Sequence, residues 1–444
     1  MLWWWSLFPL LMSGAVWLGH KESVARLRGW QETVRGWGLT LEESSGPWAA
    51  FLKFKARSGP LEVRIRILRN GIFVAVAVQG PPGFAGVRIR REIFKPSRAR
   101  EIEVGDKAFD STFFVEGPIR LVYTLFDVKT RSLLLSINDG SRMEISGSEI
   151  RSEIQYGQVP LIVPLLLELG RRFAECDDVA QRIADNARRD PATGVRLQNL
   201  LLLAREFPGE PATLEALRTA CADPSPQIQL RAAKELRAEG RDVLLALAES
   251  EGDDAWSAQA VATLDQELPF ERATAILANS LRRRRIQTAR ACLEVLGRSS
   301  NAAAAVDMLV KVMERERGEL AAVAASALGA TGDADAEPPL IHALQRETKG
   351  LQVAAANALG RIGTAAAVLP LKEAARGSSD PDLLRATRQA IAEIQSRAGG
   401  ASPGQLSLAG DEAGQLSIAP AEAGQLSLAT DAGGQLSLPP GGPR

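Results

Sequence analysis

Apolar and charged residues alternate in several short runs between positions 51 and 156. Alternation with a period of two is typical of strands that bury one face. The dipeptide Asn70-Gly71 lies between two of the runs and is a strong signal for a two-residue hairpin. The alternating runs are Phe51–Lys55, Leu61–Leu68, Ile72–Val78 and Val87–Arg90.

The remainder of this stretch mixes helix and strand patterns. Pro118 precedes an apolar pattern typical of a helix with proline in its first turn. The run Leu133–Leu135 fits either an extension of that helix or a strand, and residues 143–156 read as a final hairpin. We therefore predict an α+β domain over residues 40–157, with an antiparallel sheet and one or two covering helices. A linking helix is expected over residues 158–190, opened by Pro160.

The second half of the chain repeats itself with a period of about 32 residues. Six segments end in an apolar anchor, and the intervals between anchors are 28, 32, 32, 31 and 32 residues. A second apolar helix pattern lies between consecutive copies. One helix pair cannot bury its own apolar face, so neighbouring pairs must stack. The pattern predicts a right-handed or gently curved α-solenoid over residues 191–397. The anchors are Leu236, Leu264, Leu296, Leu328, Leu359 and Ile391.

Glycine and alanine recur at fixed places in these copies. We expect the glycines to end helices, because glycine accepts a positive φ. The alanines are expected at helix crossings, where small side chains let two backbones approach. The glycines concerned directly follow an anchor or lie four residues after one: Gly297, Gly329 and Gly360, and Gly240, Gly332 and Gly363.

The repeated pattern L-x-x-x-A-x-x-x-L-G-x-x-G resembles HEAT repeats, specifically the short HEAT-like type of the phycobilin lyases. The resemblance covers about 200 residues and is strongest over residues 320–363. It implies a scaffold fold used for contact with partners, and it carries no lyase residue into this chain. The whole arrangement also resembles a group of bacterial HEAT-repeat proteins, a resemblance that implies no activity.

The first 20 residues are predicted to be a transmembrane anchor. Leu2–Gly19 carries no charge, and its tryptophans lie near both ends, as at membrane interfaces. A cleaved signal peptide and a buried soluble helix are the alternatives. Basic residues follow the run, which predicts a single-pass protein of the cell membrane with its N-terminus outside and the bulk of the chain cytoplasmic. Residues 21–38 carry one apolar helical stripe and are expected to form a juxtamembrane helix that packs on the next domain or lies along the membrane.

The tail over residues 398–444 holds four GQLSL-type decapeptides. It is rich in Gly, Ala, Ser and Pro, so it cannot bury enough apolar surface to fold and is predicted to be disordered. The decapeptides act either as a drifting tether or as a string of short binding motifs.

Composition narrows the chemistry. Lys+Arg and Asp+Glu are 53 each in 444 residues, so the basic surplus of a dedicated nucleic-acid binder is missing. Three cysteines far apart argue against a disulfide framework, and two histidines leave little for imidazole catalysis. We therefore assign no catalytic, cofactor-binding or metal-ligating residue, no cofactor and no small-molecule ligand.

The function expected from these patterns is a membrane-anchored, non-enzymatic scaffold that binds protein partners through the solenoid. The densest basic run, Arg282, Arg283, Arg284 and Arg285, is the candidate partner-binding site. The alternative is an enzyme or cation-binding protein with its site in the 40–157 domain, where Asp106 and Asp110 are the candidate pair. A minor third option is an envelope-facing protein, if the anchor inserts the other way.

Overall fold

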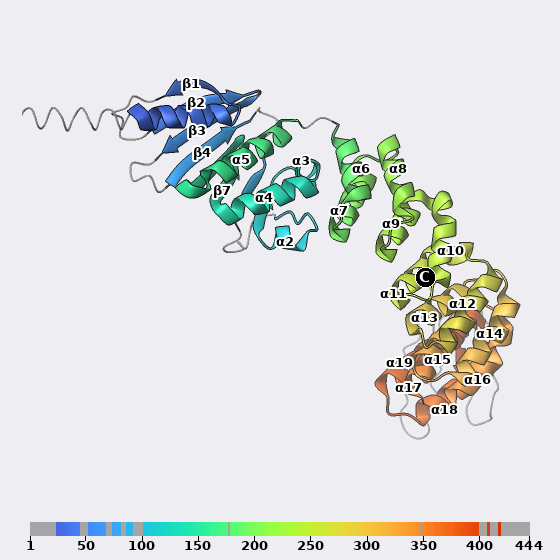
Figure 1. The fold of residues 1–444 in the computed structure, drawn as a ribbon. Helices are drawn as coiled ribbons and strands as arrows, with labels where there is room; N and C mark the ends of the chain where they lie inside the picture. Colours follow the sequence, from blue (N-terminus) through green and yellow to red (C-terminus); the bar gives the residue numbers. More distant parts are fainter. Residues whose placement is uncertain are drawn as a thin grey trace, which may run out of the picture. The chain divides into compact units, whose positions relative to one another are not determined.

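The computed structural model describes most of the chain in two compact units, Met1–Leu247 and Ala248–Arg444, which are treated separately below. The residues described are 24–44, 52–67, 73–80, 86–91, 101–175, 178–346, 348–398, 406–408 and 416–418. Figure 1 labels the helices and strands.

The first unit begins with an eight-stranded sheet in the order β1-β2-β3-β4-β8-β7-β5-β6, in which all adjacent strands are antiparallel. The alternating runs form these strands, which confirms a strand-rich N-terminal domain. The strands are β1 Thr40–Ser44, β2 Leu52–Ser58, β3 Leu61–Ile67, β4 Phe73–Gln79, β5 Arg88–Arg91, β6 Phe113–Glu116, β7 Ser141–Ser146 and β8 Glu149–Gln155.

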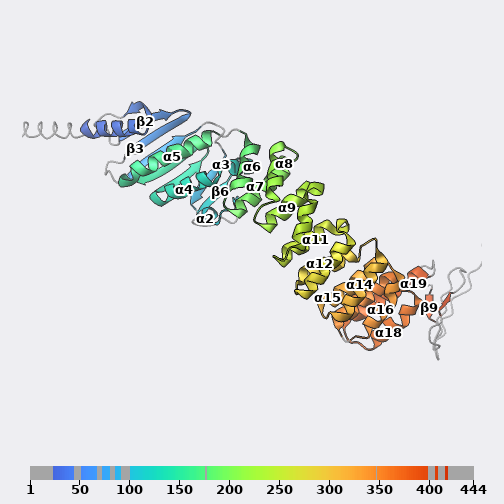
Figure 2. The same cartoon turned by 45° about the vertical axis from the view of Figure 1, so that its right-hand side comes forward.

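The two faces of the sheet differ as the period of two requires. In β3, Leu61, Val63, Ile65 and Ile67 are buried, whereas the arginines between them are exposed. Helices α4 (Val128–Gly140) and α5 (Val159–Ala174) cover the apolar face (Figure 2). The charged face carries no helix among the described elements that pack on the sheet. An antiparallel sheet with one solvated face is a common arrangement.

A helix over residues 24–36 also packs on the apolar face. Its stripe follows the predicted helical spacing: Val34 is fully buried, Trp30 is 8% exposed, and Leu27 and Trp37 pack against the same core. The Trp30 ring meets Tyr156 edge to face, with 5.7 Å between the ring centroids. The apolar stripe thus packs this helix on the strand-rich domain, which was the first of the two predicted alternatives.

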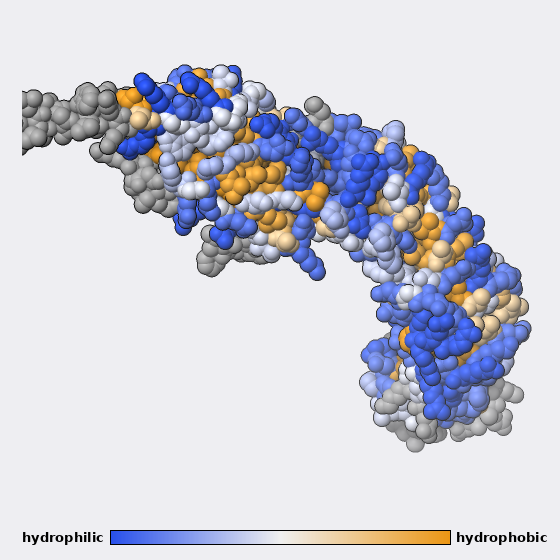
Figure 3. All heavy atoms as spheres, viewed as in Figure 1, coloured by the Kyte–Doolittle hydropathy of each residue, from blue (hydrophilic) through white to orange (hydrophobic). Residues whose placement is uncertain are grey.

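The helices between the strands resolve two open points. Helix α3 (Ile119–Leu125) starts after Pro118, as predicted. Leu133–Leu135 is helical but lies within a separate helix, α4, and does not extend α3. The linking helix expected over residues 158–190 is two helices, α5 and α6 (Val179–Arg189). Hydrophobic residues also lie on the outer side of α5, where Leu161 is 67% exposed (Figure 3).

Helical repeats follow in the first unit. Helices α6 and α7, α6 and α8, and α8 and α9 pack on one another, and α3 packs on α6. The helices that follow α6 here are α7 Thr193–Glu206, α8 Pro211–Ala220 and α9 Pro226–Leu236, and α10 Arg241–Glu249 begins in this unit and ends in the second.

The second unit continues the helix pairs. Its odd-numbered helices stack directly on one another, α11 on α13, α13 on α15, α15 on α17 and α17 on α19, and its even-numbered helices form the other layer. This is the solenoid-like stacking that the repeat predicts. The helices are α11 Asp254–Leu264, α12 Phe270–Arg282, α13 Ile286–Leu296, α14 Ala302–Arg315, α15 Glu319–Thr331, α16 Glu337–Leu344, α17 Lys349–Ile362, α18 Val368–Arg376 and α19 Pro381–Ala398.

The repeat glycines follow the prediction only in part. Gly297 ends α13 but has a right-handed φ of −63°, and Gly329 and Gly360 lie inside helices α15 and α17 and do not end them. A Cβ on Gly329 would lie 2.6 Å from the Cα of Ala358 on the next helix of the layer, and one on Gly297 would lie 2.9 Å from the Cα of Ala327. These glycines therefore permit close helix crossings. Gly332 ends α15 with the predicted left-handed backbone, at φ of 72°, whereas Gly363 ends α17 with φ of −63°.

The localisation predicted from the sequence needs correction. Across the described residues, none of the helices is long and apolar enough to cross a bilayer. This finding is against a single-pass membrane protein. The segment on which that prediction rested, residues 1–20, lies outside the described residues.

Two short parts of the tail are described. Strands β9 (Leu406–Leu408) and β10 (Leu416–Ile418) belong to the first two decapeptides and pair antiparallel with each other. The prediction of disorder is therefore wrong for these six residues. The rest of the tail from residue 399 lies outside the described residues.

Candidate functional site

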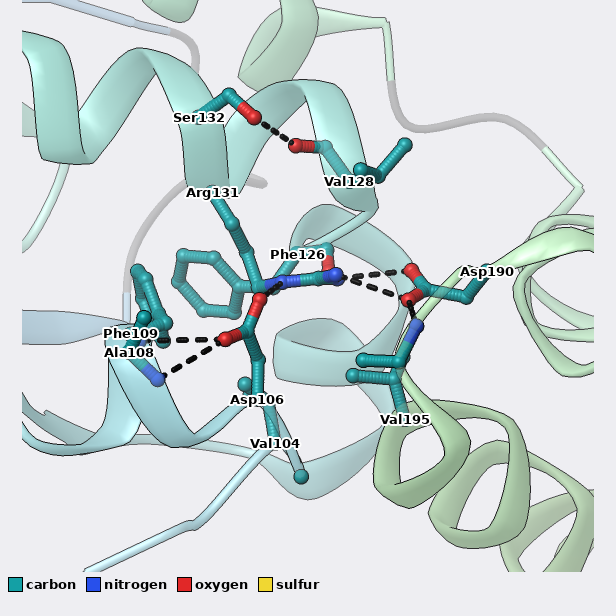
Figure 4. Close-up of polar contacts among 12 residues, drawn as sticks. Val104, Asp106, Ala108, Phe109, Phe126, Val128, Arg131, Ser132, Asp190 and Val195 are labelled. Carbon is teal, nitrogen blue, oxygen red and sulfur yellow. Dashed lines mark hydrogen bonds and ion pairs between the residues drawn. The ribbon is translucent and has the colours of Figure 1, made fainter.

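A buried arginine joins the strand-rich domain to the first helical repeat of the same unit. Arg131 on α4 is 2% exposed and donates from both terminal nitrogens to the carboxylate of Asp190, at 2.9 Å each. Its Nε donates to Asp106 at 2.8 Å (Figure 4). Asp190, between α6 and α7, is itself 1% exposed at its side chain. The guanidinium is thus enclosed between two carboxylates from different parts of the fold.

The next repeat has a similar arginine–aspartate pair. Arg196 on α7 donates from Nε and Nη2 to the two oxygens of Asp223, at 2.7 and 2.9 Å. Asp190 and Asp223 each also accept a backbone N–H two residues further on, at 2.9 and 2.8 Å. Arg131 and Arg196 therefore each bind both oxygens of an aspartate, Arg131 through its two terminal nitrogens and Arg196 through Nε and Nη2.

Two glycines bring the backbones together at this junction. Gly105 has φ of +96°, and a Cβ there would lie 2.3 Å from the carbonyl carbon of Gly194 at the start of α7. Nearby, the side-chain amide of Asn186 donates to the carbonyl of Tyr123 at 3.0 Å, and Tyr123 donates to the carbonyl of Glu103 at 2.9 Å. Burial raises the pKa of Tyr123 to about 12, so this hydroxyl stays a donor. The junction has the features of a fixed structural joint.

Asp106 and Asp110, the pair considered for catalysis or cation binding, already have partners. Asp106 caps α2 (Lys107–Asp110) by accepting from Ala108 and Phe109, and Asp110 accepts from the backbone of Val104 and Gly105 at 2.9 Å each. Partial burial raises the pKa of Asp106, but the Arg131 hydrogen bond and the two backbone donors outweigh it and leave that pKa below its ordinary value. For Asp110, burial dominates and raises the pKa. Both carboxylates thus serve local structure.

Other reactive side chains are also enclosed or isolated. Cys292 is fully buried, and burial raises the pKa of its thiol to about 12, which disfavours the thiolate that a nucleophile requires. Over the described part of the chain, no three His, Cys, Asp or Glu side chains lie close enough together to hold a metal ion.

The basic run at residues 282–285 is divided by the structure. Arg285 is 9% exposed and binds the carbonyls of Ser250 and Asp253 and the hydroxyl of Ser257 in the preceding repeat. Arg284 is 83% exposed at its side chain and lies 4.0 Å from Glu316.

The other two arginines of the run point to local partners. Arg283 pairs with Glu251 at 2.6 Å, and Arg282 donates to the amide oxygen of Asn279 at 2.8 Å. The four side chains therefore do not form one cationic surface, and a partner role for the three outer arginines stays a prediction.

A row of equivalent surface positions crosses the stacked helices of the second unit. Two positions of the repeat face outward on each of α13, α15, α17 and α19, and they are charged at both ends of the row but uncharged in the middle. We name these eight residues the repeat surface: Arg290 and Glu294, Ala322 and Ser326, Val353 and Asn357, and Arg385 and Gln389.

The repeat surface is hollowed between α17 and α19. A groove of about 570 Å³ is lined there by Val353, Asn357, Arg385 and Gln389 together with Asp380 and Asp382. At the other end of the row, Arg290 pairs with Glu294 and with Glu319, both at 3.0 Å. The arrangement offers shape and hydrogen-bonding groups to a partner, and its lining contains no nucleophile–base pair.

Comparison with known proteins supports the repeat interpretation for part of the chain. A family profile for HEAT repeats matches residues 306–392, which run from α14 to α19. No curated protein matches the chain. Among solved structures, the chain is similar to human deoxyhypusine hydroxylase in complex with glycerol, at 16% identity and a TM-score of 0.21, over 49% of this chain and 96% of that one. The chain thus carries HEAT repeats over residues 306–392.

Proposed function

We propose that this protein is a non-enzymatic scaffold that binds a protein partner across the repeat surface. HEAT repeats commonly mediate protein–protein interactions, and each repeat contributes equivalent side chains to one continuous surface. The observation that carries the proposal is the direct stacking of α13, α15, α17 and α19, which aligns those side chains in a row.

The composition of the row supports a protein partner. The middle of the row holds two apolar side chains, the half-buried Val353 and Ala322 at the equivalent place on the neighbouring helix, and the uncharged polar side chains of Asn357 and Ser326 lie next to them. Charged and amide side chains such as Arg385 and Gln389 surround it. A central apolar patch with a polar rim is the usual anatomy of a protein interface.

A substitution at the middle of the row tests the proposal. Val353→Arg places a long cation where the partner is expected to pack. Leu369→Arg is the matched control, because Leu369 is 45% exposed on α18 in the other helix layer. Affinity purification of the full chain, with quantification of every co-purified protein, is then compared between the two variants and the wild type.

For at least one co-purified protein, the recovered amount is expected to fall fivefold or more with Val353→Arg and to stay at the wild-type level with Leu369→Arg. Circular dichroism of both variants monitors folding. If every protein recovered with the wild type is recovered equally with Val353→Arg, the repeat surface is not the binding surface.

A further inference from the structure

The uncovered face of the sheet forms a second large hollow, separate from the repeat surface. It is a groove of about 1400 Å³ that runs across strands β2, β3, β4, β8 and β7 and reaches β1 and β5 at its two sides. Eight of its lining residues are Lys or Arg and four are Glu. In a chain with 53 basic and 53 acidic residues, this local surplus of positive charge is a distinct feature.

The floor of the groove consists of small side chains. Ala75 and Ala77 are the outward residues of β4, the central strand, and both are half-buried. On the neighbouring strand β3, Arg64 is paired with Ala77 and Arg66 with Ala75. On the other side, β8 places Arg151 beside Ala77 and Glu153 beside Ala75. Short side chains flanked by long charged ones leave a trough in which a polypeptide backbone has room.

The cationic side chains of the groove differ in whether they already form ion pairs. Arg64 donates to Glu62 at 2.8 Å and Arg151 to Glu149 at 2.6 Å, so their charges are partly neutralised. Within the described part of the chain, neither Arg66 nor Arg142 forms an ion pair, and both side chains are exposed. These two arginines are available to an incoming anion.

The positions of Arg66 and Arg142 define a spacing for the anion. Arg66 on β3 is in register with Ala75 on β4, Ala75 with Glu153 on β8, and Glu153 with Arg142 on β7. Three strand spacings of about 4.8 Å separate the two arginines, or roughly 14 Å. An extended peptide covers that distance in about four residues.

The same groove is unfavourable for nucleic acid. Among the described residues that line the groove, Phe54 is the only aromatic one, and it is 2% exposed and belongs to the core, so these residues offer single-stranded bases no ring on which to stack. Glu144 and Glu153 also lie in the groove and repel a chain with a charge on every unit. A peptide with carboxylates at intervals avoids these positions.

We propose that the open sheet face binds an acidic, extended segment of a protein partner, with Arg66 and Arg142 receiving carboxylates about four residues apart. This interaction goes beyond the proposed function of the repeat surface and does not depend on it. The test uses the full chain and a fluorescein-labelled 12-residue peptide with Glu at every fourth position and Ser elsewhere, whose binding is followed by fluorescence anisotropy.

The wild type is expected to bind this peptide and to bind a Gln-for-Glu analogue at least tenfold more weakly. Arg66→Glu combined with Arg142→Glu is expected to weaken binding of the acidic peptide at least tenfold. Ala77→Glu, which blocks the floor of the trough, is expected to weaken it at least fivefold. Arg35→Glu, on the helix over residues 24–36 that packs on the other face, should change binding less than twofold.

Two results overturn the proposal. The first is equal binding by the Arg66/Arg142 double variant and the Arg35 variant. The second is tighter binding of a 12-residue oligothymidine, or of phosphatidylcholine vesicles with one fifth phosphatidylserine, with the same dependence on Arg66 and Arg142. Val353→Arg should leave peptide binding unchanged, so failure here is distinguishable from failure of the repeat surface.

Discussion

Arg131 binds Asp190 through two hydrogen bonds, as Arg196 binds Asp223 one repeat later, although Arg131 uses its two terminal nitrogens and Arg196 uses Nε and Nη2. The strand-rich domain thus contacts the first helical repeat as another repeat would. Repeat arrays need a cap at their ends, because a terminal pair otherwise exposes the apolar face that a neighbour would cover. Within the first unit, α4 supplies part of that cap.

Removal of Arg131 is expected to destabilise the first unit strongly. Arg131→Met leaves the buried carboxylate of Asp190 without its counter-charge, a change that typically costs about 3–5 kcal/mol. Arg218→Met is the matched control, because Arg218 and Glu239 are both more than half exposed and an exposed pair contributes little. Urea unfolding followed by circular dichroism measures both; equal midpoints for the two variants would contradict the assignment.

The coupling of the two residues is a separate prediction. Asp190→Asn alone also breaks the pair, whereas Arg131→Met with Asp190→Asn removes both charges at once. We expect the double variant to be less destabilised than the sum of the two single variants, by about 1–3 kcal/mol. Additive effects would mean that the ion pair does not carry the stability of the junction.

Stability should depend on pH in opposite ways through Asp106 and Asp110. The folded-state pKa of Asp106 lies below 3.8, so its contribution is fully present above that pH and is lost as the pH falls through the folded pKa. The pKa of Asp110 is raised, so folding favours its neutral form and the wild type loses stability as the pH rises from 3.8 through the folded value.

The free energies of unfolding of the wild type, Asp106→Asn and Asp110→Asn, measured between pH 2.5 and pH 7, show the direction of each pH dependence. The advantage of the wild type over Asp106→Asn should grow as the pH rises toward about 4 and then level off. Its advantage over Asp110→Asn should shrink as the pH rises above about 4. Parallel curves would show that these carboxylates do not titrate as their contacts require.

The crossing glycines predict a contrast between two substitutions to alanine in the second unit. Gly329→Ala forces a Cβ to within 2.6 Å of the backbone of Ala358 and should destabilise by about 1–3 kcal/mol. Gly350→Ala, in α17, meets no atom within 4 Å and should be neutral or stabilise by up to about 1 kcal/mol. Thermal unfolding followed by circular dichroism compares them; a stabilised Gly329→Ala would contradict close crossing as the reason for this glycine.

Periodic features of the fold were predictable from the sequence, because each rests on local spacing. The strand pattern at Leu61–Ile67 and the stripe of Trp30 and Val34 are read from neighbouring residues, and both are seen. The repeat period also predicted stacked helix pairs. The role of Gly329 was misjudged, because a glycine near a helix end is compatible with either termination or a close crossing, and only the neighbouring helix decides between them.

The junction could not be predicted, because its partners are far apart in the sequence. Arg131 and Asp190 are separated by 59 positions, and no local pattern connects them. A partial signal was present: Asp190 and Asp223 both precede a proline that lies just before a helix, so the first repeats share an Asp-Pro step. The open sheet face was equally hidden, since the cations of β3, β7 and β8 come together only through strand order.

The basic run yields a last contrast between adjacent residues. Arg284 has φ of 58°, a left-handed backbone that costs a non-glycine residue about 1–2 kcal/mol, and its side chain is 83% exposed. Arg284→Gly should therefore stabilise the second unit by up to about 1 kcal/mol. Arg285→Met should destabilise it by about 1–3 kcal/mol, because the carbonyls of Ser250 and Asp253 lose their donor. Urea unfolding measures the stability of both variants. Similar effects at the two positions would contradict the different environments of Arg284 and Arg285.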